Sequence, residues 1–240
     1  MNDQSAQDLP EHLRLYVVGD IHGRLDLFDQ RCTAIAQDLD RHPMAEVRLV
    51  LLGDYIDRGP DSAGVIERLA SLKTPAPPIC LRGNHETMLQ SFLSDPDTMD
   101  QWRHFGGLET LASYGVDIQE VIVGQGYPEA QHALSRLMPP HHLLFLADLQ
   151  NCFELGPYYF CHAGVRPGLP LAQQQADDLL WIREPFLSSD ADHGRIIIHG
   201  HTPVNEPEFH ANRINLDTGA YDSNRLTCLV LERGRCEILA

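Results

Sequence analysis

Five short motifs, each combining glycine with aspartate, asparagine or histidine, follow one another along the 240-residue chain. They occupy residues 19–23 (GDIHG), 53–59 (GDYIDRG), 83–86 (GNHE), 162–164 (HAG) and 200–203 (GHTP). Carboxylate, amide and imidazole donors without a thiolate suit Mn²⁺, Fe, Zn²⁺ or Mg²⁺ in a catalytic centre rather than a structural zinc site. Ligands from five separated segments therefore predict a two-metal centre that hydrolyses phosphate esters.

The prediction depends on the motifs occurring together, since a lone Gly-Asp is usually a turn and a lone histidine is usually a core residue. Asp20 and His22 are two residues apart, so in an extended segment both side chains can face one metal. Asp54 ends the next apolar run, and its two oxygens can bridge two cations about 3.5–4 Å apart. The shell of the second metal is then completed by Asn84, His162 and His201.

The first three motifs each follow a predicted strand. Apolar runs predict strands at residues 13–18, 47–52 and 79–81, and helical spacing of apolar residues predicts helices at residues 25–39 and 62–72. This β-α-β-α-β order predicts parallel pairing with right-handed crossovers. The ligands would then collect at the carboxyl ends of the strands, where open α/β sheets place their sites.

The remainder of the chain divides into a helical part and a strand-rich part. The helical pattern of residues 87–150 predicts a cap inserted beside the site. Further strands are predicted at residues 158–161, 195–198, 213–216, 227–232 and 236–239. We interpret them as a second, more antiparallel sheet packed on the first. The predicted organisation is a polar N-terminal segment (residues 1–12) followed by one α/β domain (residues 13–240).

Composition limits the partners and the location. The formal net charge of −16 argues against nucleic acid, because such a partner requires a basic surface. No apolar run reaches the roughly 18 residues that span a bilayer, so no membrane partner is expected. The acidic N-terminus is unlike a signal peptide, and the six cysteines lack a Cys-x-x-Cys pair. We therefore expect free thiols and a cytoplasmic location.

The motifs resemble those of a known family. The first three are similar to the phosphoprotein phosphatase branch of the calcineurin-like metallophosphoesterases, and most similar to its bacterial and bacteriophage-lambda-type serine/threonine phosphatases. Residues 200–203 followed by 215–220 (NLDTGA) are similar to the closing segment of that subgroup. The resemblance covers residues 13–232. It implies a double β-sheet sandwich flanked by helices, with two divalent metals, manganese being preferred over iron, zinc or magnesium.

The resemblance also implies a role for each site residue. The first metal takes Asp20, His22 and Asp54, and the second takes Asp54, Asn84, His162 and His201. His85 is the general acid, Asp57 holds its tautomer, and Arg58 binds phosphate. Further phosphate contacts are expected from Arg82, which could instead pair with a carboxylate, and from Arg183, which could instead lie on the rim of a sheet.

His199, two residues before His201, is the ambiguous histidine, and the Gly-His-Thr-Pro match leaves it a structural or supporting role. The predicted mechanism is a single in-line displacement, in which a hydroxide that bridges the metals attacks phosphorus. His85 protonates the departing oxygen.

Two substrate classes are compatible with the motifs. The Asp57-Arg58-Gly59 segment and Glu86 favour a serine/threonine protein phosphatase acting on phosphoproteins or small phosphoesters. The alternative is a symmetrical bis(5'-nucleosyl)-tetraphosphatase, which hydrolyses diadenosine tetraphosphate and tends to carry aspartate at the position of Glu86. The predicted cap offers aromatic residues for an adenine, although their pattern favours helix core: Trp102, Phe105 and Tyr114. A non-catalytic scaffold would require a lost ligand, and every expected ligand position is filled.

Overall fold

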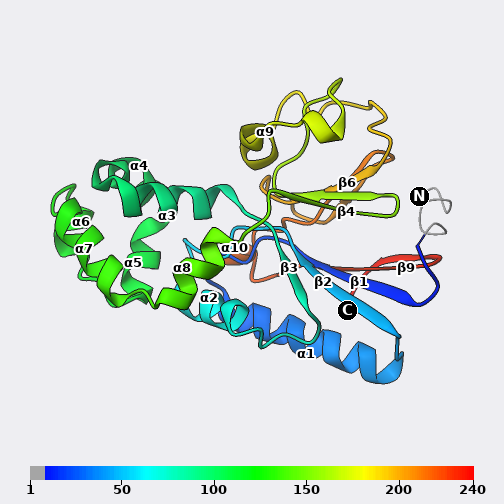
Figure 1. Ribbon diagram of the computed structural model, residues 1–240, viewed down its shortest axis with the longest axis horizontal. Coiled ribbons are helices and arrows are strands. Elements are labelled where there is room, and N and C mark those ends of the chain that lie inside the picture. The colour runs from blue at the N-terminus through cyan, green and yellow to red at the C-terminus, as the bar shows by residue number, and fades with distance from the viewer. Residues whose placement is uncertain (1–8) are drawn as a thin grey trace.

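The computed structural model describes residues 9–240, so most of the polar segment predicted for residues 1–12 lies outside the described residues. Two five-stranded sheets pack face to face (Figure 1), with strand orders β10-β9-β1-β2-β3 and β4-β5-β6-β8-β7. The first contains β1 (Leu13–Val18), β2 (Glu46–Leu51), β3 (Pro78–Cys80), β9 (Cys228–Glu232) and β10 (Arg235–Ile238). The second contains β4 (Cys152–Leu155), β5 (Tyr158–Cys161), β6 (Ile196–His199), β7 (Glu208–Phe209) and β8 (Arg213–Asn215).

Helices cover the outer faces and extend beyond one end of the sheets. The first sheet is covered by α1 (Leu25–Arg41) and α2 (Ser62–Ala70), and the second by α9 (Ala176–Trp181). A helical region extends from the sheets (Figure 1) and contains α3 (Asn84–Ser94), α4 (Met99–Trp102), α5 (Gly107–Ser113), α6 (Gln119–Ile122), α7 (Tyr127–Leu137) and α8 (Pro140–Ala147). The short α10 (Ala220–Ser223) precedes β9. Within residues 9–240, none of the helices combines the length and apolarity that crossing a bilayer requires.

The sheet assignment of the last two strands differs from the prediction. β9 pairs antiparallel with β1, and β10 pairs antiparallel with β9, so both belong to the first sheet. The second sheet is mixed, because β5, β6 and β8 are parallel while β4 and β7 are antiparallel to their neighbours. β2 occupies only one edge of β1, which is buried along its whole length. The backbone groups on the other edge need a partner, and β9 supplies it.

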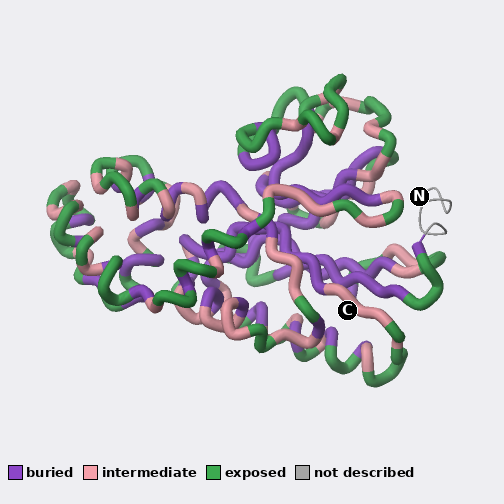
Figure 2. The backbone as a smooth tube through the Cα atoms, viewed as in Figure 1, coloured by how far each residue is buried: buried purple, intermediate pink, exposed green. Residues whose placement is uncertain are grey.

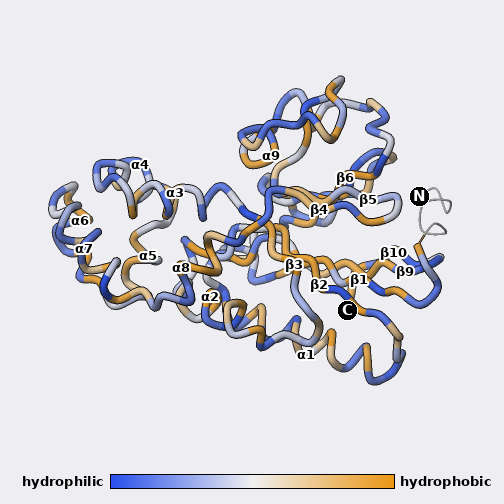
Figure 3. The backbone as a smooth tube through the Cα atoms, viewed as in Figure 1, coloured by the Kyte–Doolittle hydropathy of each residue, from blue (hydrophilic) through white to orange (hydrophobic). Residues whose placement is uncertain are grey.

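The sandwich core follows from the two-residue period of β1. Leu15 and Val17 face the second sheet, whereas Tyr16 and Val18 face α1 and α2. A strand buried on both faces is expected to be mostly apolar, and Arg14 is the one charged residue of β1. The inner strands β1, β9, β5, β6 and β8 are mostly buried in Figure 2, whereas the edge strands are more exposed, and the strands of both sheets are largely hydrophobic in Figure 3.

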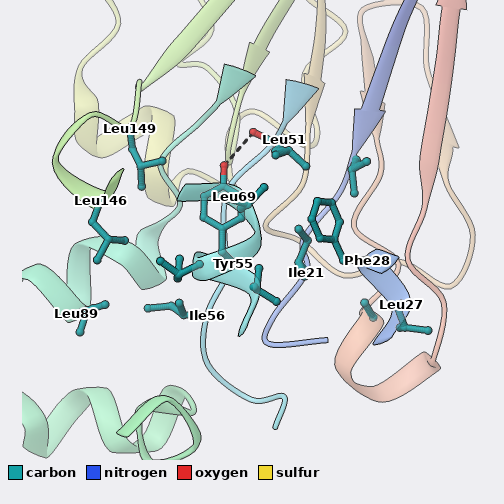
Figure 4. Packing of buried hydrophobic residues seen from close by; sticks show 14 of the residues in the cluster. Ile21, Leu27, Phe28, Leu51, Tyr55, Ile56, Leu69, Leu89, Leu146 and Leu149 are labelled. Atoms are coloured by element: carbon teal, nitrogen blue, oxygen red, sulfur yellow. Dashed lines mark hydrogen bonds between the residues drawn. The ribbon is translucent and has the colours of Figure 1, made fainter. Parts of the chain in front are cut away.

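Tyr55, directly after Asp54, ties this core to the loop that follows β2. Its ring lies among buried residues that include Leu69 and Leu146 (Figure 4). The hydroxyl lies 2.6 Å from the Leu81 carbonyl oxygen and 3.3 Å from that of Leu51. The ends of β2 and β3 are thereby held together, and the chemistry-bearing residues follow at those ends.

A buried ion pair joins α1 to the first sheet. Arg14 on β1 lies 3.2 Å from Asp38 on α1, and both side chains are at most 4% exposed. Tyr16 donates a 2.6 Å hydrogen bond to the same carboxylate, and His42 lies 3.1 Å from its other oxygen. Burial raises the pKa of Asp38, but these hydrogen bonds and the Arg14 charge outweigh it, so the pKa lies below its ordinary value.

Replacing Asp38 by alanine should lower the free energy of unfolding by about 3 kcal/mol, because the buried guanidinium loses a partner. The lowered pKa means that this stabilisation is present above pH 3.8 and is lost as the pH falls through the folded-state value. Urea unfolding at neutral pH and below pH 3.8 measures both effects. The exposed Asp40→Ala on the same helix is the control, with a change below about 0.5 kcal/mol. An equal loss of unfolding free energy in Asp38→Ala and Asp40→Ala would contradict a stabilising role for the buried Arg14–Asp38 pair.

Candidate active site

The predicted metal ligands lie together at the carboxyl ends of strands from both sheets. Asp20 and His22 follow β1, Asp54 follows β2, Asn84 begins α3 after β3, His162 follows β5 and His201 follows β6. Each of the six is at most 8% exposed. Because parallel strands end at the same edge of a sheet, residues far apart in sequence converge there.

Asp54 lies between two groups of donors. Its Oδ2 is 3.5 Å from His22 Nε2, and its Oδ1 is 3.4 Å from His162 Nε2. The donor atoms of each group lie within 4.8 Å of one another, the groups being His22, Asp54, His85 and Asp54, His162, His201. One carboxylate oxygen thus faces each group, which is the arrangement that a bridging carboxylate requires.

Backbone carbonyls orient two of the histidines. His22 Nδ1 lies 2.9 Å from the Ile56 carbonyl oxygen, and His162 Nδ1 lies 2.9 Å from that of Leu52. Donation from Nδ1 fixes the tautomer and leaves the Nε2 lone pair facing the centre, as in metal-binding histidines. Asn84 Oδ1 lies 2.9 Å from both His162 Nε2 and His201 Nδ1, so it also faces the centre.

The site carries more buried negative charge than its own residues neutralise. Asp20 Oδ1 is buried without a hydrogen-bond partner among the described residues. Burial and the nearby charges of Asp217 and Asp54 raise the pKa of Asp20. Although burial lowers the pKa of His162, the charges of Asp54 and Asp20 raise it to about 10. Positive charge is therefore favoured at this position, and the oxygen and imidazole donors fit divalent metals.

The backbone around these residues adopts costly conformations. Positive φ occurs at His22 (47°), Asp54 (52°), Asp57 (72°), Arg58 (68°) and His201 (65°). Each costs a non-glycine residue about 1 kcal/mol or more, and such strain clusters at functional sites. The motif glycines allow close approach: a Cβ on Gly83 would lie 2.0 Å from Asp54 Oδ1, and one on Gly200 would lie 2.0 Å from Asp20 Oδ1.

Glu86 fixes the geometry between the second and third motifs. Its buried carboxylate accepts hydrogen bonds from the backbone N–H groups of Asp54 (3.0 Å), Tyr55 (2.8 Å) and Gly83 (2.9 Å). Burial and the charge of Asp54 raise the pKa of Glu86 to about 7. Glu86 therefore positions the proposed metal ligand Asp54 through backbone hydrogen bonds, and its carboxylate faces these N–H groups rather than the metal centre.

His85 and Asp57 form a buried pair beside the ligands. His85 Nδ1 lies 2.6 Å from Asp57 Oδ2, and His85 Nε2 faces the centre 3.7 Å from Asp54 Oδ2. Burial lowers the pKa of His85, but the charges of Asp54 and Asp57 outweigh it and the pKa is raised. A histidine so placed can hold a proton on Nε2 for donation into the site.

Two residues of the helical region orient Asp57. Trp102 Nε1 donates to Asp57 Oδ2 at 2.6 Å, and the Thr110 hydroxyl donates to Asp57 Oδ1 at 2.5 Å. The sequence analysis interpreted Trp102 as helix core, and the ring is buried, but its N–H serves the His85–Asp57 pair. Neither residue belongs to a motif, so no local signal identified it.

Trp102→Phe should keep the ring packed while removing the hydrogen bond to Asp57. We expect kcat for an alkyl phosphate to fall about 10-fold, as for other partners that orient site residues. The loss for an activated aryl phosphate should be smaller, because its leaving group depends less on proton donation. Steady-state kinetics with both substrates measures this. Thr110→Ser, which keeps a hydroxyl, is the control, and equal losses on both substrates would show that Trp102 acts only through packing.

The three predicted phosphate-binding arginines have different environments. Arg58 is half-buried and contacts both His22 Nε2 (3.1 Å) and His85 Nε2 (3.4 Å). Arg183 is exposed but lies near His201. Burial and the charge of His162 lower the pKa of His201 to about 3, and the charge of Arg183 adds to this effect. Arg82 donates to the Leu149 carbonyl at 3.3 Å, and its contact with phosphate stays a prediction.

Residues outside the predicted set also border the site. Tyr221, 38% exposed, lies under the Arg58 guanidinium at 4.5 Å and edge-on to His22 at 5.4 Å. Asp217 lay in a segment quoted for the resemblance but received no role there. His199 is buried, packs against Phe186 with ring centroids 5.0 Å apart, and lies outside both donor groups. This packing supports a structural role for His199.

Arg58→Ala should lower kcat/KM about 10- to 100-fold, through a raised KM and a lowered kcat, because a charged hydrogen bond is worth about 1.5–3 kcal/mol. The loss should be similar for alkyl and aryl esters, since both present the same phosphoryl group. Arg58→Lys keeps the charge without the two-pronged geometry and should lie between alanine and wild type. Unchanged kinetics in Arg58→Ala would show that the residue is structural.

Comparison with known families agrees with this geometry. The family model of the calcineurin-like phosphoesterases matches residues 13–230. The chain belongs to the calcineurin-like phosphoesterases. Its double sheet flanked by helices is the fold of that family, as the resemblance implied.

The curated relatives of this phosphoesterase have two kinds of names. Serine/threonine-protein phosphatase 2 of Escherichia coli is 29% identical over 223 residues, covering 89% of this chain and 90% of that protein. The asymmetrical bis(5'-nucleosyl)-tetraphosphatase of Bacillus mycoides is 30% identical over 236 residues, covering 89% and 88%. A solved structure of a candidate diadenosine tetraphosphatase has a TM-score of 0.64 at 21% identity, covering 94% of this chain and 92% of that one. The Escherichia coli phosphatase among these relatives agrees with the phosphoprotein phosphatase branch that the motifs indicate.

Proposed function

We propose that this phosphoesterase is a metal-dependent phosphomonoesterase that removes phosphate from phosphoserine and phosphothreonine in proteins. The observation that supports it is the buried His85–Asp57 pair, 2.6 Å apart, with His85 Nε2 facing the proposed ligands. The leaving group of these esters is an alkoxide, which needs a proton as the bond to phosphorus breaks. Cleavage of a dinucleoside polyphosphate expels a nucleotide through its phosphate oxygen instead, and that anionic leaving group depends far less on such an acid.

The chain's own residues would perform most of the remaining steps. Two divalent cations, for which manganese is our first choice, would polarise the phosphoryl oxygens and lower the pKa of a water molecule when bound. They would be held by Asp20, His22, Asp54, Asn84, His162 and His201. Arg58 would swing from the histidines to two phosphoryl oxygens. Arg183 would add positive charge at the rim, which offsets the acidic surface for an incoming phosphate.

Cellular location belongs to the same proposal. All six cysteines are free thiols, three of them buried. Free thiols fit a reducing compartment, and we propose a cytoplasmic enzyme on that ground.

An initial-rate comparison tests the substrate class. Protein stripped of metal and reloaded with Mn²⁺ is assayed with a phosphothreonine peptide and with diadenosine tetraphosphate. We expect kcat/KM for the peptide to exceed that for the dinucleotide. The reverse preference would overturn the protein phosphatase assignment and favour the second candidate.

That second candidate is a bis(5'-nucleosyl)-tetraphosphatase, and exposed aromatic residues beside the centre support it. Trp181 is 39% exposed, lies edge-on to His201 with centroids 6.3 Å apart, and borders a cleft of about 180 Å³. Tyr221 lies edge-on to His22, which belongs to the other donor group. An exposed aromatic ring thus lies beside each of the two donor groups. A nucleobase could stack on either ring. Of the three aromatic residues considered for this role in the sequence, Trp102 and Tyr114 are buried, whereas Phe105 is half-buried and lies edge-on to His85 with centroids 6.3 Å apart.

The products of this alternative reaction identify its type. Symmetrical hydrolysis, which the sequence analysis considered, gives two molecules of ADP. Asymmetrical hydrolysis, which the names of the Bacillus relatives specify, gives ATP and AMP. Chromatography of the products from the same assay distinguishes them.

A further inference from the structure

A second cluster of metal-binding side chains lies where α2 meets α8. Glu67 Oε2 is 2.7 Å from His141 Nε2 and 2.9 Å from His142 Nε2. The three donor atoms lie within 4.8 Å of one another, and none of these residues contributes to the two donor groups of the active site. One carboxylate oxygen thus lies between two imidazole nitrogens that belong to adjacent residues at the start of α8.

The cluster has one fixed and two adaptable members. The His142 side chain is 3% exposed, whereas those of His141 and Glu67 are 50% and 44% exposed. Tyr114 fixes the buried ring, because its hydroxyl lies 2.9 Å from His142 Nδ1. A metal-binding histidine usually has such a partner on its other nitrogen, which sets the tautomer and the ring orientation.

We propose that Glu67, His141 and His142 bind a divalent transition metal, with zinc as the best fit, which joins α8 to α2. Two imidazole nitrogens and one carboxylate oxygen are a donor set that zinc takes with water in a fourth position. The exposure of Glu67 and His141 leaves that position open to solvent. The metal replaces the protons between Glu67 and the two Nε2 atoms, while His142 Nδ1–H donates to the Tyr114 oxygen.

The present distances are close to those of a metal site. Zinc lies about 2.0–2.1 Å from imidazole nitrogen, so ligands in a tetrahedral shell are about 3.3 Å apart. The hydrogen-bonded N···O distances of 2.7 and 2.9 Å therefore have to lengthen by a few tenths of an ångström. His141 and Glu67 can supply this movement because their side chains are half-exposed, while His142 stays in place.

The position of the cluster predicts a structural effect. α2 begins at Ser62, whose hydroxyl accepts a hydrogen bond from the Asp57 backbone N–H. α8 ends shortly before Leu149 and Gln150, whose carbonyl oxygens accept hydrogen bonds from Arg82. A metal between the helices would thus stabilise the helical region against the part of the chain that carries the active site, without contacting substrate.

Zinc binding by the whole protein tests the proposal. Wild type and His141→Ala are dialysed against Zn²⁺ buffered by a chelator, and bound zinc is measured by elemental analysis. Wild type should hold one zinc more per chain than His141→Ala. The control is His210→Ala, which removes an exposed histidine that contacts Glu208 at 3.3 Å and Arg213 at 3.4 Å, and it should match wild type. Zinc should also raise the Tm of wild type by about 5 °C more than that of the variant.

A second variant keeps the test independent of the folding of the first. Glu67→Gln retains hydrogen bonding to the imidazoles but loses the anionic ligand, and it should also hold one zinc less. Equal zinc content and equal Tm shifts in wild type, His141→Ala and Glu67→Gln would show a hydrogen-bonded cluster without a metal. Loss of one zinc in His210→Ala as well would show non-specific binding to surface histidines and would also overturn the proposal.

Discussion

Asp54→Asn is expected to lower kcat/KM by about 10³-fold or more for every phosphoester substrate, because metal-ion catalysis is worth several kcal/mol. The two oxygens of Asp54 face different histidines, at 3.5 Å from His22 Nε2 and 3.4 Å from His162 Nε2. An amide offers one oxygen and no charge, so it can serve one cation and not bridge two. Steady-state kinetics at saturating Mn²⁺ and metal content by elemental analysis measure the effect.

The control for this variant is Asp61→Asn, a carboxylate-to-amide change of the same size near the motif. Asp61 accepts the Gly64 N–H bond at 2.8 Å at the start of α2, and asparagine is an equally good helix cap. Asp61→Asn should therefore retain wild-type activity and metal content. Wild-type turnover by Asp54→Asn at saturating metal would contradict the dinuclear centre.

The parts of this site that the sequence could predict are those set by local structure. An apolar run ending at Gly-Asp marks the end of a buried strand, and β1 was predicted with the bounds that it has, Leu13–Val18. Parallel strands linked by helices place their carboxyl ends together. The convergence of Asp20 and Asp54 therefore follows from the order of elements alone, before any contact is known.

The parts that the sequence could not predict depend on contacts between distant segments. β9 is predicted as a strand by its pattern, but only the unpaired edge of β1 determines which sheet it joins. Trp102 and Thr110 reach Asp57 from 45 and 53 residues away, and their periodicity reports only that they face a core. A pattern shows that a side chain is buried, whereas the tertiary fold determines what its polar atom contacts.

The same distinction applies to the substrate. Glu86 entered the sequence analysis as a residue that separates protein phosphatases from tetraphosphatases. Its carboxylate accepts hydrogen bonds from three backbone N–H groups. Glutamate at this position therefore affects how the second and third motifs are held together rather than which groups contact the substrate. The leaving-group chemistry of His85 and the exposed rings of Trp181 and Tyr221 are more direct indications of substrate.

His85→Asn should therefore separate substrates by their leaving groups. Asparagine keeps a polar side chain but cannot donate a proton as an imidazolium does, and general acid catalysis contributes about 10²- to 10⁴-fold. We expect a loss in that range for a phosphothreonine peptide and a loss of at most about 10-fold for an activated aryl phosphate, whose phenolate leaves without full protonation. Initial rates with both substrates, at saturating Mn²⁺ and with metal content measured, give the ratio.

The comparison with Arg58→Ala shows whether this ratio reports proton donation. Arg58 faces the phosphoryl group that both substrates share, so its removal should lower both rates by a similar factor. Loss of His85 should instead change the ratio of the two rates by at least about 10-fold. An equal loss on both substrates in His85→Asn would remove the general-acid role. Asp57, with Trp102 and Thr110 behind it, would then position His85 to bind substrate rather than to donate a proton. A preference for alkyl esters would have to come from the cleft beside Trp181.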